Sequence, residues 1–318
     1  MSIRSRLLIL VVVVVAIGVI LIATRRAGFS GGLRAAFDAE FLTRPDGYPG
    51  LSKHYGFRFP TEPVQMDPGL MYKAVADGQI DVIDGFATDG RIPAYDLLVL
   101  DDDKSFFPPY YAAPLVRTDT LAMHPQLRNE LNRLGGRISD EAMRRLNYQV
   151  DEKGRRASDV AREFLLKGGL IPEHAHAGNG AAGSVVVGGK QFTEQEILGE
   201  MIAILIESDT DLRVRRKLNL GGTMICFNAL RSGDIDVYPE YTGTGLVNIL
   251  KANVVNDPEE VYSIVKTQFR DQWGLIWLEP FGFNNTYTLT MRRDQAERVG
   301  IRTISDLAAV VNRERRHR

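Results

Sequence analysis

The feature that most constrains the fold is a segment that occurs twice without gaps. Residues 74–90 read AVADGQIDVIDGFATDG and residues 229–245 read ALRSGDIDVYPEYTGTG. Each copy predicts the end of a helix, a glycine that caps it, a buried Ile-Asp-Val strand and a glycine-rich loop after the strand. Two such copies predict two lobes that each contribute a similar half of one site.

Alternating strands and helices surround the two copies, and this order predicts mainly parallel sheets with helices on both faces. Strands are expected at 33–41, 80–83, 95–100 and 185–187, and helices at 68–76, 126–134, 140–146, 157–166 and 193–207. Asp67 is the expected N-cap of one helix. Thr193 and Glu196 are expected to form a capping box at another. Residues 171–183 (IPEHAHAGNGAAG) have the composition of a linker.

The N-terminus carries an unbroken apolar run, Leu7–Ala23, with arginines at positions 4, 6, 25 and 26 around it. The run has the length of a short membrane span, and no small-x-small cleavage motif or lipoprotein cysteine follows it. We therefore expect residues 1–30 to be a signal-anchor and spacer, with a cleaved secretory signal as the alternative. Either reading predicts an extracytoplasmic protein, in the periplasm or on the outer face of the cytoplasmic membrane.

The composition excludes several classes of function. Lysine plus arginine (39) balances aspartate plus glutamate (40), which leaves no basic footprint for nucleic acid. The single cysteine, Cys226, excludes an intrachain disulfide framework and is expected to be buried filler. His174 and His176 lack a third ligand nearby, so neither a metal nor a cofactor is expected. No nucleophile–base pairing, G-x-S-x-G motif or phosphate loop indicates an enzyme.

The loops after the two repeated strands are the expected binding site, because ligands of open parallel sheets bind beyond the carboxyl ends of the strands. Tyr241 and Thr244 fall there in one copy, and Phe86 and Asp89 in the other.

Further aromatic residues lie in similar loops: Tyr287 in FNNTY and Tyr110 in FFPPYY. Several aromatic faces suit a quaternary ammonium, a cation that rings attract although it cannot donate hydrogen bonds. Lys190 in GGKQFTEQ and Arg44 in FLTRPDG are candidate partners for an anionic group, and structural ion pairs are their alternative role.

Six stretches resemble the substrate-binding components of glycine betaine/carnitine/choline ABC importers. They are GGKQFTEQEILGEMI, DVYPEYTGTGL, FGFNNTYTL, EFLTRPDGYPGL, IDVIDGFATDGRI and DDDKSFFPPYYAAPLVR. The resemblance covers most of residues 31–171 and 184–307. It implies a type II periplasmic-binding-protein fold, with two α/β lobes, a two-strand hinge and an aromatic cage in the cleft.

The order of these stretches is reversed relative to the family, which implies a circular permutation. Residues 172–183 would then join the ancestral termini. The expected lobes are residues 31–109 with 287–318, and residues 110–171 with 184–286.

The resemblance also implies roles for single residues. The cage tyrosines of the family match Tyr241, Tyr287 and Tyr110, and Phe86 stands where tyrosine is common. Lys190, Thr244 and Arg44 match positions that contact the ligand's carboxylate or nearby polar atoms. This match favours glycine betaine or proline betaine as the ligand over choline, which has no carboxylate. Larger betaines remain alternative ligands.

The implied function is the capture of a small ligand for an ABC permease in the membrane. A membrane-anchored sensor with the same fold, uncoupled from transport, is the alternative.

Overall fold

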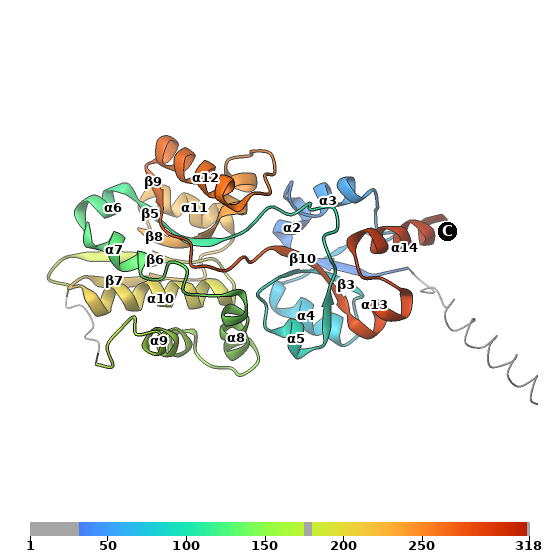
Figure 1. Cartoon of the computed structure of the whole chain (residues 1–318), viewed down its shortest axis with the longest axis horizontal. Helices are drawn as coiled ribbons and strands as arrows, with labels where there is room; N and C mark the ends of the chain where they lie inside the picture. Colours follow the sequence, from blue (N-terminus) through green and yellow to red (C-terminus); the bar gives the residue numbers. More distant parts are fainter. Residues whose placement is uncertain (1–31, 175–179, 317–318) are drawn as a thin grey trace, which may run out of the picture.

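The structure is a computed structural model that describes residues 32–174 and 180–316. These residues form two five-stranded sheets, each with its own helices, that lie side by side along the long axis of the molecule (Figure 1). We call them the first and second lobe. The first sheet has the order β2-β1-β3-β10-β4 and the second the order β7-β6-β8-β5-β9.

Both sheets are mixed. The first contains β1 (Ala35–Phe37), β2 (Val64–Gln65), β3 (Val82–Phe86), β4 (Leu97–Val99) and β10 (Tyr287–Arg292). The second contains β5 (Ala112–Arg117), β6 (Ser184–Gly188), β7 (Arg213–Lys217), β8 (Val237–Tyr241) and β9 (Leu275–Trp277). In the first, β1 pairs in parallel with β2 and β3, whereas β10 runs antiparallel to β3 and β4. In the second, β6 pairs in parallel with β7 and β8, and β5 runs antiparallel to β8 and β9. Four strands of each sheet therefore run in one direction, as expected for mainly parallel sheets, and the exceptions are β10 and β5, which each follow a crossing from the other lobe.

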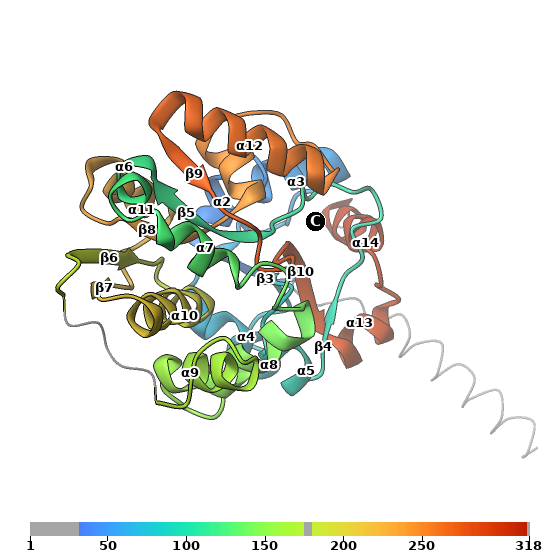
Figure 2. The same cartoon turned by 60° about the vertical axis from the view of Figure 1, so that its left-hand side comes forward.

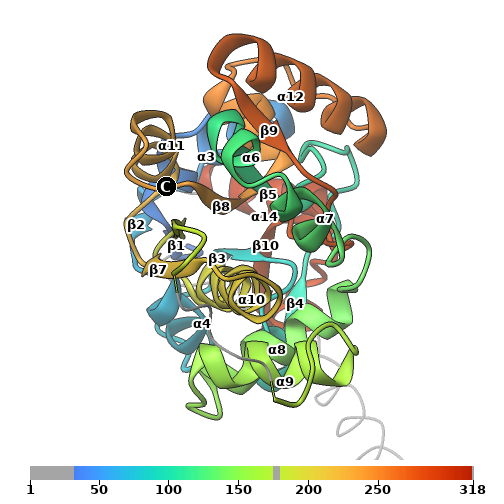
Figure 3. The ribbon, with the colours of Figure 1, turned by 90° about the vertical axis from the view of Figure 1, so that its left-hand side faces the viewer.

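Helices cover both faces of the second sheet. Its lobe contains α6 (Thr118–Met123), α7 (Gln126–Asn132), α8 (Asp140–Asp151), α9 (Ala157–Lys167), α10 (Thr193–Asp209), α11 (Thr223–Ser232), the π-helix η1 (Thr244–Ile249) and α12 (Pro258–Trp273). Figure 3 shows α8, α9 and α10 on one side of the strands and α11 and α12 on the other. The helix α10 is buried along most of its length, since it packs on β6, β7 and β8 and is covered by α8 and α9.

The first lobe is smaller. It contains α2 (Ala39–Thr43), α3 (Tyr48–Tyr55), α4 (Pro68–Ala76), α5 (Arg91–Ala94), α13 (Arg293–Val299) and α14 (Ile304–Arg316). The helix α8 of the second lobe lies against it, near α4 and α5 (Figure 2). There Arg144 Nε donates to Ala87 O over 2.8 Å, and Tyr95 Oη donates to Glu152 over 2.6 Å.

The two repeated segments adopt the same structure. The carboxylate of Asp81 accepts a hydrogen bond from Arg34 N over 2.9 Å, and the matching Asp236 accepts one from Val186 N over 2.8 Å. Each aspartate thus holds the neighbouring parallel strand in register. The matching glycine of the second copy, Gly233, has a φ of +84°, which favours glycine. The predicted order of helix end, glycine and strand is confirmed in both copies, but the strands begin only at the valine of each Ile-Asp-Val, at Val82 and Val237.

Two segments, residues 100–111 and 278–286, connect the lobes and run next to each other (Figure 1). Tyr111 forms an isolated antiparallel bridge with Asn284. Tyr110 N donates to Asn284 Oδ1 over 2.7 Å, and Asn285 N donates to Tyr110 O over 3.1 Å. These contacts between the two connecting segments fix the backbone of Tyr110 where the two lobes meet.

Several local predictions are confirmed and two are wrong. Asp67 caps α4, and Cys226 is fully buried. The strand expected at 33–41 ends at Phe37, because Asp38 caps α2 by accepting from Glu40 N over 2.6 Å. The capping box at Thr193 does not form, because this hydroxyl donates to Asp151 instead.

Within residues 32–174 and 180–316, no helix combines the length and apolar character that a membrane span requires. The predicted signal-anchor, Leu7–Ala23, lies outside the described residues.

Candidate ligand-binding site

A cavity of about 410 Å³ lies between the two lobes. Both lobes line this cavity. The first lobe contributes the end of β3, the start of β10 and the helix α2. The second lobe contributes the end of β8 and the residues just before α10 and at the start of α11. Seven of the eight residues predicted from the sequence line this cavity: Arg44, Phe86, Tyr110, Lys190, Tyr241, Thr244 and Tyr287. The ends of the repeated strands therefore do converge on one cavity.

Five aromatic rings line the cavity, one of which the sequence analysis missed. Phe192 stacks between Phe86, at 5.7 Å between ring centroids and an interplanar angle of 3°, and Tyr241, at 6.2 Å and 24°. Phe192 directly precedes α10 and belongs to the second lobe, so its stack with Phe86 spans the two lobes. Its place two residues after Lys190 in GGKQFTEQ was the signal that could have found it.

The other side of the aromatic group is built on Tyr287. Strand pairing puts Tyr287 directly opposite Phe86, with ring centroids 5.5 Å apart. The ring of Tyr110 meets Tyr287 edge-on, at 5.6 Å and 86°. Offset, tilted and edge-on arrangements are those that aromatic pairs prefer.

Both predicted cations are held in ion pairs. Lys190 Nζ lies 2.6 Å from Glu240 Oε1, and both side chains are buried. Arg44 makes a two-pronged contact with Asp46, at 2.6 and 2.9 Å. Burial alone would lower the pKa of Arg44, but Tyr287 and the Asp46 carboxylate raise it well above its ordinary value. Both residues therefore take part in structural ion pairs and also line the cavity.

The remaining polar residues of the predicted site support these pairs. Tyr110 Oη donates to Asp46 over 2.5 Å, and burial together with the Asp46 charge raises the pKa of Tyr110 well above its ordinary value. Thr244 Oγ1 accepts from Arg44 Nη2 over 3.3 Å, which links the lobes.

Asp89 is the one predicted residue that does not line this cavity. Its carboxylate holds Arg91 at 2.6 and 2.9 Å and lines a neighbouring cavity of about 190 Å³. The loop after β3 uses Asp89 for a local ion pair, and the sequence carries no signal for this difference from Thr244.

A buried carboxylate behind the aromatic rings joins both lobes and the crossing segment. Glu194, in the first turn of α10, accepts from Tyr241 Oη over 2.7 Å, from Asn285 Nδ2 over 2.8 Å and from Asn147 Nδ2 over 3.0 Å. Thr88 of the first lobe donates to the same carboxylate. Burial raises the pKa of Glu194, while the four donors act to lower it.

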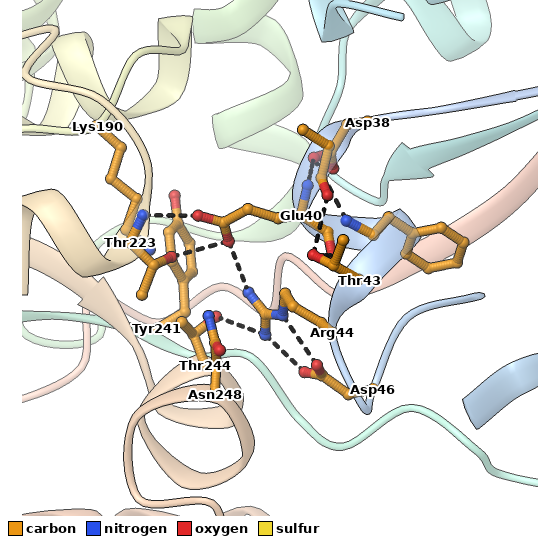
Figure 4. Close-up of polar contacts among 12 residues, drawn as sticks. Asp38, Glu40, Thr43, Arg44, Asp46, Lys190, Thr223, Tyr241, Thr244 and Asn248 are labelled. Carbon is orange, nitrogen blue, oxygen red and sulfur yellow. Dashed lines mark hydrogen bonds and ion pairs between the residues drawn. The ribbon is translucent and has the colours of Figure 1, made fainter. Parts of the chain in front are cut away.

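A second carboxylate, Glu40, reaches across the cavity from α2 to the start of α11 (Figure 4). It accepts from Thr223 N over 2.6 Å and from Thr223 Oγ1 over 3.0 Å, and it lies 3.1 Å from Arg44 Nη1. Within the described part of the chain, no group of three or more His, Cys, Asp or Glu side chains could hold a metal ion.

Comparison with known proteins identifies the family of the chain. A family model described as the substrate binding domain of an ABC-type glycine betaine transport system matches residues 27–167 and 183–317. The chain belongs to this family. The family is one of substrate-binding domains, which confirms the expectation that the chain is not an enzyme.

Individual relatives match over about half of their length. The carnitine transport binding protein OpuCC of Listeria monocytogenes is 46% identical over 136 residues, which are 42% of this chain and 44% of that protein. A glycine-betaine-binding protein of Pseudomonas aeruginosa is 37% identical over 148 residues, 46% of this chain and 47% of its own. A solved structure of a glycine betaine/carnitine/choline ABC transporter is 43% identical and covers 45% of this chain and 52% of its own, with a TM-score of 0.36.

Proposed function

We propose that this protein is the extracytoplasmic solute-binding component of an ABC importer and that it captures a quaternary-ammonium osmolyte in an aromatic cage between its lobes. Tyr241, Tyr287, Tyr110 and Phe86 are its proposed cage residues, joined by Phe192. Lys190, Arg44 and Thr244 complete the polar side of the site, and Asp89 supports the loop after β3.

The observation that carries this proposal is the convergence of five aromatic rings on one cavity within a family of betaine-transport binding domains. A desolvated aromatic face contributes about 0.5–2 kcal/mol to the binding of a cation. Four or five faces together contribute about 2–10 kcal/mol before the cost of ordering the ligand, a range that includes the roughly 8 kcal/mol of micromolar affinity. A cavity of about 410 Å³ also has a size typical of small-molecule sites.

The proposal includes a circular permutation. The family model matches in two separate segments, and each relative named above aligns over less than half of this chain. A comparison that keeps residue order can align only one half of a permuted chain, so these coverages support the permutation. The proposed lobes are residues 31–109 with 287–318, and 110–171 with 184–286, with residues 172–183 as the connection between the ancestral ends.

The proposed partner is a permease in the membrane, and the N-terminal segment is proposed to lie in or through that membrane. Closure of the lobes around the ligand would present a changed surface to the permease, as hinged binding proteins do. Loss of quaternary-ammonium uptake on deletion of the gene tests this coupling.

A membrane-anchored sensor is the second candidate function. A relative from Halobacterium salinarum, 28% identical over 41% of this chain, is a substrate-binding protein of a chemotactic signal transduction system. Normal uptake in the deletion strain, with loss of a response to the ligand, would favour the sensor over the importer.

The binding test is isothermal titration calorimetry of the full-length chain against glycine betaine, proline betaine, choline and carnitine. We expect a one-to-one, micromolar isotherm for at least one of them. Tyr241→Ala should weaken it at least tenfold, whereas Tyr241→Phe keeps the ring and should bind more tightly than the alanine variant. Tyr262→Ala, on α12 and outside the cavity, is the matched control. Unchanged affinity in a folded Tyr241→Ala protein would refute the aromatic cage.

A further inference from the structure

Glu40 occupies the part of the cavity where a ligand carboxylate would find hydrogen-bond donors. Its carboxylate accepts hydrogen bonds from the backbone N–H and the hydroxyl of Thr223, at the start of α11, and from one guanidinium nitrogen of Arg44 (Figure 4). The start of a helix favours a negative charge, because its first N–H groups have no partner within the helix. Glu40 comes from the first lobe and Thr223 from the second, so this chain fills the anion position with its own side chain.

The backbone of the second lobe is shaped for this contact. A Cβ atom at Gly222 would lie 2.6 Å from Glu40 Oε1, which is too close for two atoms that are not bonded. The backbone of Gly222 has φ −77° and ψ −176°, a conformation open to any residue. Glycine at position 222 therefore leaves room for the Glu40 carboxylate, which a larger residue would displace, whereas the backbone conformation does not call for glycine.

Among the described residues, both cations that line the cavity are already paired with carboxylates. Arg44 is paired with Asp46 and Glu40, and Lys190 with Glu240. Among the described residues that line the cavity, the other charged side chains, Asp38 and Asp67, are acidic as well. Burial would raise the pKa of Glu40, but Lys190, Arg44 and the Thr223 donors lower it below its ordinary value. Glu40 is thus ionised at neutral pH, and acidic groups outnumber basic ones around the site.

We propose that Glu40 is a built-in counter-ion that makes this site select a quaternary-ammonium cation without a carboxylate over a zwitterionic betaine. The inference rests on the proposed function and reverses the ligand preference expected from Lys190 and Arg44 alone. A plain cation gains the aromatic faces and a nearby negative charge. A betaine brings a second carboxylate that must displace Glu40 from Thr223 and Arg44 or remain beside it, and like charges at close range oppose binding.

The test compares choline with glycine betaine by isothermal titration calorimetry on the full-length chain. The wild type should bind choline at least tenfold more tightly, a difference of about 1.4 kcal/mol. Glu40→Gln removes the charge and should lower the choline-to-betaine affinity ratio at least tenfold. Gly222→Ala keeps the charge but pushes it from its position, and it should lower the same ratio. Glu62→Gln, an exposed carboxylate of the first lobe, is the matched control and should leave the ratio unchanged.

The outcomes separate the two proposals. If both ligands bind and the ratio stays within twofold of wild type in Glu40→Gln and Gly222→Ala, the counter-ion role is refuted and the cage stands. A wild type that prefers glycine betaine also refutes it. If folded wild type and variants bind neither choline nor glycine betaine but the wild type binds proline betaine or carnitine, this inference is refuted and the proposed function stands. If none of the four ligands binds to proteins that thermal melts show to be folded, the proposed function fails and this inference with it.

Discussion

Replacement of Glu194 by glutamine tests whether the buried carboxylate holds the site together. Glu194 is 2% exposed and accepts hydrogen bonds from Tyr241, Asn285, Asn147 and Thr88. Tyr241 and Asn285 donate to one of its oxygens, and Asn147 and Thr88 to the other. A glutamine keeps one acceptor oxygen but presents an NH₂ group to the other pair of donors.

The expected cost follows from the donors that lose their acceptor. A buried polar group left without a partner costs about 1–3 kcal/mol, so two such donors cost about 2–6 kcal/mol. Burial disfavours the Glu194 charge and raises its pKa, so the removal of that charge offsets part of the loss. We expect a net loss of about 3 kcal/mol in the free energy of unfolding, which lowers the Tm by roughly 5–10 °C in a protein of this size.

Thermal and urea unfolding followed by circular dichroism measure this loss. Glu259→Gln is the matched control, because Glu259 also lies in the first turn of a helix but is exposed to solvent. That variant should remain within about 0.5 kcal/mol of wild type, as surface substitutions usually do. A Glu194→Gln protein as stable as the control would show that the four donors find other partners, and the reasoning from the buried carboxylate would be wrong.

Two further predictions concern buried ionisable groups. Burial raises the pKa of Cys226 to about 12, so the native protein at pH 8 should not react with a thiol reagent such as DTNB. The urea-unfolded chain should react and release one equivalent of the coloured thiolate. Rapid labelling of the native protein would contradict this prediction. Asp84 is fully buried, one of its oxygens has no partner among the described residues, and burial and the neighbouring Asp38 raise its pKa well above the ordinary value. A carboxyl with a raised folded-state pKa contributes stability that is complete below its unfolded pKa of about 3.9 and lost as the pH rises through the folded value. Asp84→Asn should therefore raise the Tm at pH 7.5 by more than at pH 4, and equal Tm differences at the two pH values would contradict the assignment.

The parts of this structure that sequence predicts well are those that local chemistry decides. The helix–glycine–strand unit was found in both copies because Gly78 and Gly233 adopt a positive φ and because a buried strand follows each glycine, starting at Val82 and Val237. The ends of the repeated strands also indicated the cavity, since Tyr241 and Phe86 occupy matching positions there.

The parts that sequence missed depend on residues that are far apart along the chain. Lys190 meets Glu240, and Glu40 meets Thr223 across 183 residues. The motifs that contain Lys190 and Arg44 indicated two cations near the site, but not the carboxylates with which these cations pair in the fold. Strand direction is also hard to predict from local sequence. The antiparallel strands β5 and β10 each follow a crossing between the lobes, and no local sequence pattern indicates these crossings.

The two copies of the repeat conserve the scaffold and differ where they reach the site. Asp81 and Asp236 each bind the backbone of the adjacent parallel strand, so this part of the unit serves the sheet in both lobes. At the end of the strand, the Tyr241 hydroxyl bonds to Glu194 and fixes its ring within the second lobe. Phe86, in the matching position, has no hydroxyl, and its ring is held by the stack with Phe192 of the other lobe and by Tyr287. Tyr241 is thus positioned within its own lobe, whereas Phe86 also depends on contact with the other lobe. Under the proposed function, a ligand that draws the lobes together would therefore also complete the aromatic surface of the cage.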